Sequence, residues 1–468
     1  MNWIVSSPGV FTQEFGGVEK IYRHVSQAFR PFGREHWGLY CVCSLELDTQ
    51  ALSSSDESSA ILRDAWRALR REFPGLGIVP REVSQKTYKL PDNESVESWI
   101  SETFIVQHDK DADAVLASYP ARDLPCLYFF PASSQILFLA SHWRIDGIGT
   151  CLLLNRFFAI LSRGVQPIPD GSDIWRNDLH RISPTLEDAV GAPNTGDSEL
   201  ESFAQKYIAD HHKNAVHAGG LSYMGDATTA PGHPTRAAIM LDKDSTGSLV
   251  RACKEHNISV TAAVHAALAD TVFKTALNDE KRAVPEKYAA VMSVNMRDHL
   301  PPPYNSSDHA VGVFVTGVTP TVHRSDSFLQ KATKLRAYYR DWYSDKSMQA
   351  LRITTEKHFD AMFGSHRQKD GPPPKPPSNV TLSSLGIIEK HMARSHSDAV
   401  QVKVTGFRFG VSMMTRQLLL YIWTFDGRLT FSVNYNDAYY SPEIAHALLE
   451  SVRSVLEKEM AIQLLTNP

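Results

Sequence analysis

The stretch that decides the fold is Gln135-Ile136-Leu137-Phe138-Leu139-Ala140-Ser141-His142-Trp143-Arg144-Ile145-Asp146-Gly147-Ile148-Gly149. Its first six residues form an apolar run that is typical of a buried strand. Apolar residues then recur at helical spacing from Ile148 to Leu161, which predicts a helix. His142 and Asp146 therefore lie on a turn between a strand and a helix, a common position for side chains that do chemistry.

His142 and Asp146 are the candidate catalytic residues. Imidazole titrates near neutral pH and takes a proton from a hydroxyl or an amine, while a buried carboxylate four positions later anchors the turn that aims it. The structural alternatives are a core histidine with satisfied hydrogen bonds and, for Asp146, the N-cap of the following helix. Gly147 and Gly149 favour the functional interpretation, because glycine allows the backbone to approach other groups closely.

Composition indicates a soluble globular protein with two lobes. A chain of 468 residues exceeds one ordinary core. Charged residues are 21% and hydrophobic residues 43%, and 48 basic against 52 acidic side chains give a net charge of -4. Nucleic acid is not an expected partner, because the chain has no cluster of basic residues. The five cysteines are odd in number and lie mostly in apolar runs, which favours a reducing compartment.

No feature of the sequence points to a membrane. Residues 1–8 lack the basic and apolar regions of a signal peptide, and no apolar run approaches the length of a membrane span. We therefore expect a cytoplasmic protein with no membrane partner. Because nothing in the sequence demands an oligomer, we also expect a monomer.

Periodicity and turn residues predict a mixed α/β chain in three parts. We expect an N-terminal lobe at 1–163, a crossover rich in Pro, Gly, Ser and Asp at 164–235, and a C-terminal lobe at 236–468. The expected helices, besides the one above, are 53–73, 200–212, 245–256, one starting at 261, and 442–460. The expected strands are 37–47, 236–241, 288–296, 309–318, 406–414, 417–425 and 428–435. Residues 371–377 predict a polyproline-like loop.

Several other kinds of site are not supported. The chain has no Gly-X-Ser-X-Gly pentapeptide and no P-loop, and Gly147-Ile148-Gly149 lacks the third glycine of a dinucleotide site. The alternating Asp109, Asp111 and Asp113 lack the glycine and glutamate of a calcium loop. His211-His212 has no second pair of ligands and is interpreted as surface histidine. No metal and no permanently bound cofactor is expected.

Residues 142–147 resemble the HxxxDG signature of an acyltransferase superfamily. This superfamily contains the condensation domains of nonribosomal peptide synthetases and free-standing enzymes related to chloramphenicol acetyltransferase. Other stretches resemble family motifs in the same order, namely 62–74, Val294-Asn295-Met296-Arg297 with Pro301-Pro302, 310–315, 383–386 and 431–436. The similarity therefore spans most of the chain.

Two departures narrow the resemblance. Peptide-forming condensation domains usually carry a second histidine before the catalytic one, and here that position is Ser141. The DFGWG motif of the plant-type enzymes is also missing, since the nearest stretch, 406–410, lacks the aspartate and the tryptophan. The chain therefore resembles most the free-standing fungal trichothecene O-acetyltransferases.

The resemblance implies an α/β fold of two chloramphenicol-acetyltransferase-like lobes, each a mixed sheet with flanking helices, around a central channel. It implies that His142 is the general base and that Asp146 is mainly structural, paired with Arg297, with Gly147 supporting the site. The implied donor is acyl-CoA or a carrier-protein thioester, and the implied acceptor is a small hydroxylated secondary metabolite. The alternatives are cyclisation or hydrolysis by the same fold, or a non-catalytic module that binds a carrier protein or a ligand. The acceptor's binding residues remain unknown from the sequence.

Overall fold

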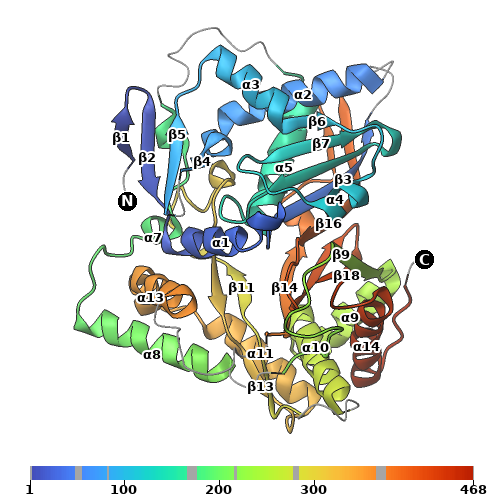
Figure 1. The fold of residues 1–468 in the computed structure, drawn as a ribbon. Coiled ribbons are helices and arrows are strands. Elements are labelled where there is room, and N and C mark those ends of the chain that lie inside the picture. Colours follow the sequence, from blue (N-terminus) through green and yellow to red (C-terminus); the bar gives the residue numbers. More distant parts are fainter. Residues whose placement is uncertain are drawn as a thin grey trace. The chain divides into compact units, whose positions relative to one another are not determined.

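The structure is a computed structural model that describes residues 3–47, 55–81, 84–165, 177–215, 219–277, 284–364 and 376–466. Helices and mixed sheets alternate along it, which confirms the expected α/β class (Figure 1). The chain divides into two compact units. Unit 1 consists of 1–191, 295–315 and 388–412, and unit 2 consists of 192–294, 316–387 and 413–468.

The units are interleaved in sequence, which differs from the expected continuous boundaries at 163 and 236. Two late segments, 295–315 and 388–412, were expected in the C-terminal lobe but belong to unit 1. The second of them supplies a strand that pairs with an N-terminal strand, and the first supplies the arginine that pairs with Asp146. Hydrogen bonds between segments distant in sequence therefore set the division.

Unit 1 is built on a six-stranded sheet in the order β15-β16-β3-β8-β7-β6. The bounds of these strands are Ser395–Ser397, Gln401–Val411, Leu39–Leu47, Gln135–Ala140, Cys126–Phe130 and Phe104–Val106. Neighbours are antiparallel except β6 and β7. A second sheet has the order β1-β2-β5-β4, with bounds Ile4–Ser7, Val10–Glu14, Gln85–Lys89 and Val79–Pro80.

The α-helices that the structure describes in unit 1 all lie in its first segment, residues 1–191. They are α1 (Gly17–Gln27), α2 (Ser55–Glu72), α3 (Asn93–Thr103), α4 (Ala112–Ser118), α5 (Gly147–Arg163), α6 (Asp178–Arg181) and α7 (Leu186–Ala189). In α2 the predicted apolar stripe is buried, and the ring of Trp66 lies edge-on to Phe157 of α5 at 6.5 Å between centroids. Helix α5 follows β8 directly and ends at Gly164, whose φ of 75° is suited to a residue without a Cβ.

Unit 2 contains a four-stranded sheet in the order β14-β17-β18-β9. The strands are Val380–Ile387, Leu418–Phe425, Arg428–Asn436 and Pro234–Met240, and only β14 and β17 are parallel. Its helices are α8 (Ser198–Ala215), α9 (Lys243–Glu255), α10 (Val260–Leu277), α11 (Phe328–Asp341), α12 (Asp345–Gln349), α13 (Leu351–Phe363) and α14 (Pro442–Met460). Helix α10 contributes a run of fully buried residues to the core of this unit.

Two short strand pairs complete the fold. They are β10 (Lys287–Ala289) with β13 (Thr321–His323), and β11 (Met292–Asn295) with β12 (Val315–Val318). The strand predicted at 288–296 is thus split in two. The strand predicted at 309–318 is wrong over most of its length, because only Val315–Val318 is a strand. The backbone before it bonds to Asp146 instead of to a sheet.

Most other predicted elements are confirmed. Strand β8 and helix α14 have the expected bounds, and α2, α5, α8, α9, α10, β3, β9, β17 and β18 differ from prediction by a few residues at their ends. The strand predicted at 406–414 starts earlier, at Gln401, and ends at Val411. The polyproline-like stretch lies mostly outside the described residues. No helix within the described ranges is both long and apolar enough to cross a membrane.

Candidate active site

The turn that carries His142 is held at both of its ends. Strand β8 ends at Ala140. There the hydroxyl oxygen of Tyr119 lies at hydrogen-bond distance from two carbonyl oxygens, 2.9 Å from that of Leu39 on the adjacent strand and 3.2 Å from that of Ala140. The Arg144 amide donates to the Ser141 carbonyl at 3.0 Å, which closes a tight turn around His142. The sequence therefore places the imidazole between a rigid strand and a rigid helix.

The imidazole of His142 lies flat against an aromatic ring. Its centroid is 4.0 Å from that of Tyr22 in α1, with an angle of 6° between the planes. Trp37 packs on the same tyrosine at 5.7 Å. The His142 side chain is half-buried, and its Nδ1 is fully buried without a hydrogen bond to another described residue. The stack restricts the ring to one plane.

Burial disfavours the charged form of His142. Loss of hydration lowers the pKa of the imidazole below its ordinary value, while its own backbone carbonyl and the Asp146 carboxylate act in the opposite direction. A neutral imidazole has a free lone pair, as a general base requires.

Asp146 is fully buried, and neighbouring groups use both of its carboxylate oxygens. Oδ1 accepts from the Gly149 amide at 2.7 Å, so that Asp146 is the N-cap of α5. Oδ2 accepts from the Phe314 amide at 2.8 Å. Arg297 Nη1 donates to Oδ1 at 2.8 Å and to Oδ2 at 2.9 Å. The Asp146 amide in turn donates to the Gly312 carbonyl at 3.3 Å. This carboxylate is occupied as a structural anchor.

Arg297 is the partner of Asp146 that the family resemblance implies. Its guanidinium is 4% exposed and lies 5.2 Å from the ring centroid of Phe314. The sequence analysis expected Arg297 in the C-terminal lobe, so that the pair would connect two lobes. In the structure both residues belong to unit 1, so the ion pair is internal to that unit.

The glycines of the motif have different surroundings. Gly147 is the first residue of α5. Its role in supporting the site stays a prediction. At Gly149 a Cβ would lie 2.3 Å from the Ala310 carbonyl oxygen and 2.9 Å from Arg297 Nη2. The close backbone approach that the two glycines suggested therefore occurs at Gly149.

The sequence alone assigns no role to Trp143 and Arg144. In the structure they connect the turn to neighbouring segments of unit 1. The Arg144 guanidinium donates to the carbonyls of Gly75 at 2.5 Å, Ile78 at 2.6 Å and Asp123 at 2.7 Å. Its Cζ lies 4.5 Å from the ring centroid of Trp143. Burial lowers the pKa of Arg144 to about 9. Both side chains are buried and structural.

Sequence reasoning missed Tyr22, Glu35 and Trp37, which lie more than a hundred residues before His142. Glu35 accepts a hydrogen bond from Ser141, and the two aromatic residues form the stack described above. No periodicity or motif marks them. The substitution of Ser141 for the histidine of peptide-forming domains was the one local signal near this contact.

The other sequence candidates do not form a metal site. No group of three potential ligands is found among the residues that the structure describes. Of the pair predicted as surface histidine, His212 is exposed and His211 is half-buried. His211 bonds to Thr319 at 2.6 Å and packs on His358 at 4.8 Å, and burial lowers its pKa to about 4. The five cysteines are buried and reduced.

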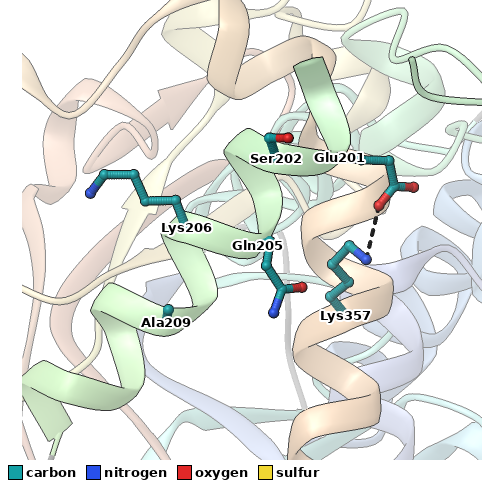
Figure 2. A pocket seen from close by; sticks show the side chains of 6 residues that line it. All are labelled: Glu201, Ser202, Gln205, Lys206, Ala209 and Lys357. Atoms are coloured by element: carbon teal, nitrogen blue, oxygen red, sulfur yellow. Dashed lines mark ion pairs between the residues drawn. The ribbon is translucent and has the colours of Figure 1, made fainter. Parts of the chain in front are cut away.

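Unit 2 has a hollow of about 500 Å³ between α8 and α13. Figure 2 shows its lining residues, Glu201, Ser202, Gln205, Lys206, Ala209 and Lys357. Lys357 and Glu201 form an ion pair at 2.9 Å. The hollow contains neither a histidine nor a paired nucleophile and base, so we assign it no catalytic role.

Sequence comparison identifies the family. The chain is 46% identical to the O-acetyltransferase pigM of Monascus ruber over 468 residues, which cover 99% of this chain and 88% of that protein. The chain belongs to this family of fungal O-acetyltransferases. A second member, the azaphilone biosynthesis cluster protein M of Aspergillus terreus, is 39% identical over the full length of both chains.

Two further comparisons concern part of the sequence and the fold. Residues 230–434 match the family described as the phthiocerol/phthiodiolone dimycocerosyl transferase C-terminus. The fold matches that of the TRI3 trichothecene 15-O-acetyltransferase from Fusarium sporotrichioides with a TM-score of 0.79, 18% identity and coverage of 97% of this chain and 96% of that one. The two fungal relatives confirm the expected acyltransferase class and the resemblance to the fungal branch.

Proposed function

We propose that this acyltransferase moves an acetyl or other acyl group from coenzyme A to a hydroxyl of a fungal secondary metabolite, with His142 as the general base. The observation that carries the proposal is the imidazole of His142, which is stacked on Tyr22 at 4.0 Å on a turn held at both ends and whose pKa burial lowers. Such a fixed, uncharged base meets the requirement for proton transfer from an alcohol.

In the proposed reaction, Nε2 of His142 takes the proton of the acceptor hydroxyl as that oxygen attacks the thioester carbonyl. The carbon–oxygen bond forms and gives a tetrahedral intermediate. The carbon–sulfur bond then breaks, the thiolate takes the proton back from the imidazolium, and an ester and a free thiol leave. We assign Nε2 to the substrate because Nδ1 is buried.

Asp146 takes no part in proton transfer in this proposal. Its two oxygens already accept hydrogen bonds from Gly149, Phe314 and Arg297. Its function is to hold the start of α5 and, through the turn, the orientation of His142. This division of roles separates the two members of the predicted catalytic pair.

The proposal has a pH signature. Because burial lowers the pKa of His142, we expect the loss of acyl transfer on acidification to occur below the ordinary histidine range. The measurement is the pH profile of kcat/KM, which reports the free enzyme. A profile that falls already at or above pH 7 as acid is added would contradict a depressed pKa.

The direct test compares wild type with His142→Ala, using acetyl-CoA and hydroxylated azaphilones as the first acceptors, since one relative is named for an azaphilone cluster. Mass spectrometry detects the added acetyl mass. We expect His142→Ala to lower the rate by about 10²- to 10⁴-fold with an unchanged circular dichroism spectrum. Wild-type transfer by the variant would overturn the base assignment. Loss of water from the acceptor would instead indicate cyclisation, and an unchanged acceptor would indicate binding alone.

A further inference from the structure

A buried glutamate contacts the residue before the proposed base. Glu35 is 1% exposed and lies just before β3. The hydroxyl of Ser141 donates to Glu35 Oε2 at 3.0 Å, and Ser141 is itself 5% exposed. Because Ser141 is bonded directly to His142, a hydrogen bond on its side chain restrains the backbone that carries the imidazole.

Residues 35–37 also contact the imidazole of His142 indirectly, through aromatic rings. Trp37 has a φ of 61°, a left-handed conformation that is unfavourable for a tryptophan, and its amide donates to the Ser412 carbonyl at 2.8 Å. In this conformation its ring packs against Tyr22, which stacks on His142. Strained backbone of this kind persists only where the surroundings hold it. Residues 35–37 therefore support His142 on the side of its backbone and on the face of its ring.

The charged side chains near Glu35 form ion pairs or hydrogen bonds with other groups. Asp123 pairs with Arg30 and lies 3.8 Å from Arg23. Arg144 bonds backbone carbonyls, and Tyr119 bonds the ends of the two strands. Glu35 Oε1 is buried without a partner among the described residues, and the adjacent His36 is neutral because burial lowers its pKa to about 3. The Ser141 hydroxyl donates to the other Glu35 oxygen, Oε2.

Such a carboxyl favours its protonated form. Burial raises the pKa of Glu35 to about 7, while Ser141, Arg30 and Arg23 act to lower it and Asp123 acts to raise it. A carboxylic acid has one donor and two acceptor oxygens, whereas a buried anion requires several donors. Ionisation near neutral pH would keep the hydrogen bond from Ser141, but it would leave buried charge on Oε1, which has no donor among the described residues, and would so disfavour the packed position of Glu35.

We propose that Glu35 is a positioning residue for His142 and that its neutral acid form, hydrogen-bonded to Ser141, holds the histidine turn in the active conformation. This inference rests on the proposed role of His142. Glu35 touches no substrate in it. Its effect passes through the hydroxyl of Ser141 and, by way of Trp37 and Tyr22, through the stacked rings.

The first test separates turnover from binding. We expect Glu35→Ala and Ser141→Ala each to lower kcat by about tenfold or more with little change in KM for acetyl-CoA, because a misplaced base slows the chemical step. Glu35→Gln keeps an acceptor for Ser141 and an uncharged side chain, so it should recover the kcat that Glu35→Ala loses. Unchanged kcat in both alanine variants overturns the proposal.

The second test uses pH. The folded-state pKa of Glu35 lies above the ordinary value of 4.5, so its stabilisation is fully present below pH 4.5 and is lost as pH rises through about 7. Relative to Glu35→Gln, we expect the Tm of wild type to fall between pH 4.5 and pH 7, and its kcat to fall as pH rises through about 7. Superimposable Tm and kcat profiles of the two proteins would rule out a controlling ionisation at Glu35.

A matched control is available in the same unit. Asp178 is fully buried, its pKa is also raised by burial, and it bonds to Tyr88 and Arg181 and not to the histidine turn. Asp178→Asn should change the pH dependence of Tm and leave that of kcat as in wild type. If Asp178→Asn removes the kcat ionisation as well, the effect is general to buried carboxyls and the proposal fails.

His142→Ala is measured in parallel to separate the two proposals. An inactive His142→Ala with an unaffected Glu35→Ala contradicts the role of Glu35 and leaves the general base standing. If His142→Ala is active, His142 is not the general base, and the proposal for Glu35 fails together with it.

Discussion

At the scale of single residues, the ion pair of Asp146 with Arg297 has the largest structural role in the site. Asp146 is 0% exposed, and it receives hydrogen bonds from Gly149 in the same turn and from Arg297 and Phe314, which are distant in sequence. Removing one partner of a buried pair leaves the other charge without compensation, and this penalty exceeds the net value of the pair itself.

We therefore expect Asp146→Ala to lower the free energy of unfolding by about 3–5 kcal/mol. The measurement is urea denaturation followed by circular dichroism. Glu286→Ala is the control, since Glu286 and Arg324 form an exposed pair whose loss should cost at most about 1 kcal/mol. Equal losses in the two variants would contradict the structural role of Asp146.

The stacked ring of Tyr22 gives a second prediction at this scale. Tyr22→Phe retains the aromatic face that lies 4.0 Å from His142, whereas Tyr22→Leu removes it. We expect Tyr22→Phe to keep most of the wild-type kcat and Tyr22→Leu to lose about tenfold, because the imidazole is no longer held in one plane. Steady-state kinetics decide this, and a Phe variant as slow as the Leu variant would assign the effect to the phenolic hydroxyl instead.

At the scale of elements, α5 depends on a glycine that helix propensity alone would disfavour. Alanine in a helix interior is ordinarily better than glycine by about 1 kcal/mol. At Gly149, however, a Cβ would lie 2.3 Å from a backbone carbonyl oxygen, which cannot move as the end of a side chain can. The close approach of Ala310 to this turn of α5 outweighs the propensity.

The prediction is that Gly149→Ala destabilises the protein by about 1–3 kcal/mol, as overpacking does. Gly247 lies inside α9, and there a Cβ would meet only the tip of the Arg251 side chain, at 3.3 Å. Gly247→Ala should therefore stabilise by up to about 1 kcal/mol. Thermal denaturation of both variants gives opposite shifts in Tm, and shifts of the same sign would refute the steric argument.

Local pattern predicted the elements well and long-range contacts poorly. Strand β8 and helix α14 have strong periodicity and clear end signals, so their bounds were predictable. Residues 310–314 look like a strand because they are apolar, but their backbone bonds to Asp146, a contact that no local pattern contains. The same reason hid Glu35 and Tyr22, since their relation to His142 exists only once the chain has folded.

At the scale of the whole molecule, the chain enters each unit more than once. The sheet of unit 1 takes β15 and β16 from residues 395–411, and β16 pairs with β3 along nearly its full length. Without this strand, β3 would be an exposed sheet edge, which promotes aggregation. A cut at the end of the first continuous segment therefore does not release a complete domain.

We expect a fragment of residues 1–191 to aggregate or to lack a cooperative thermal transition, because it contains neither β16 nor Arg297. Size-exclusion chromatography and differential scanning calorimetry test this, with the full chain as the control. A monomeric fragment with a sharp transition would show that the N-terminal segment folds without its later strands.

The late positions of Arg297 and Phe314 in the sequence also affect the order in which the protein can fold during synthesis. His142 and Asp146 are synthesised early. Arg297 and Phe314, which bond Asp146, are synthesised more than 150 residues later, and β16 follows them. Nascent chains generally fold from the N-terminus as each portion becomes available. The turn that carries His142 therefore cannot reach its final structure until late in synthesis, and a chain truncated before residue 297 would lack the guanidinium that pairs with Asp146.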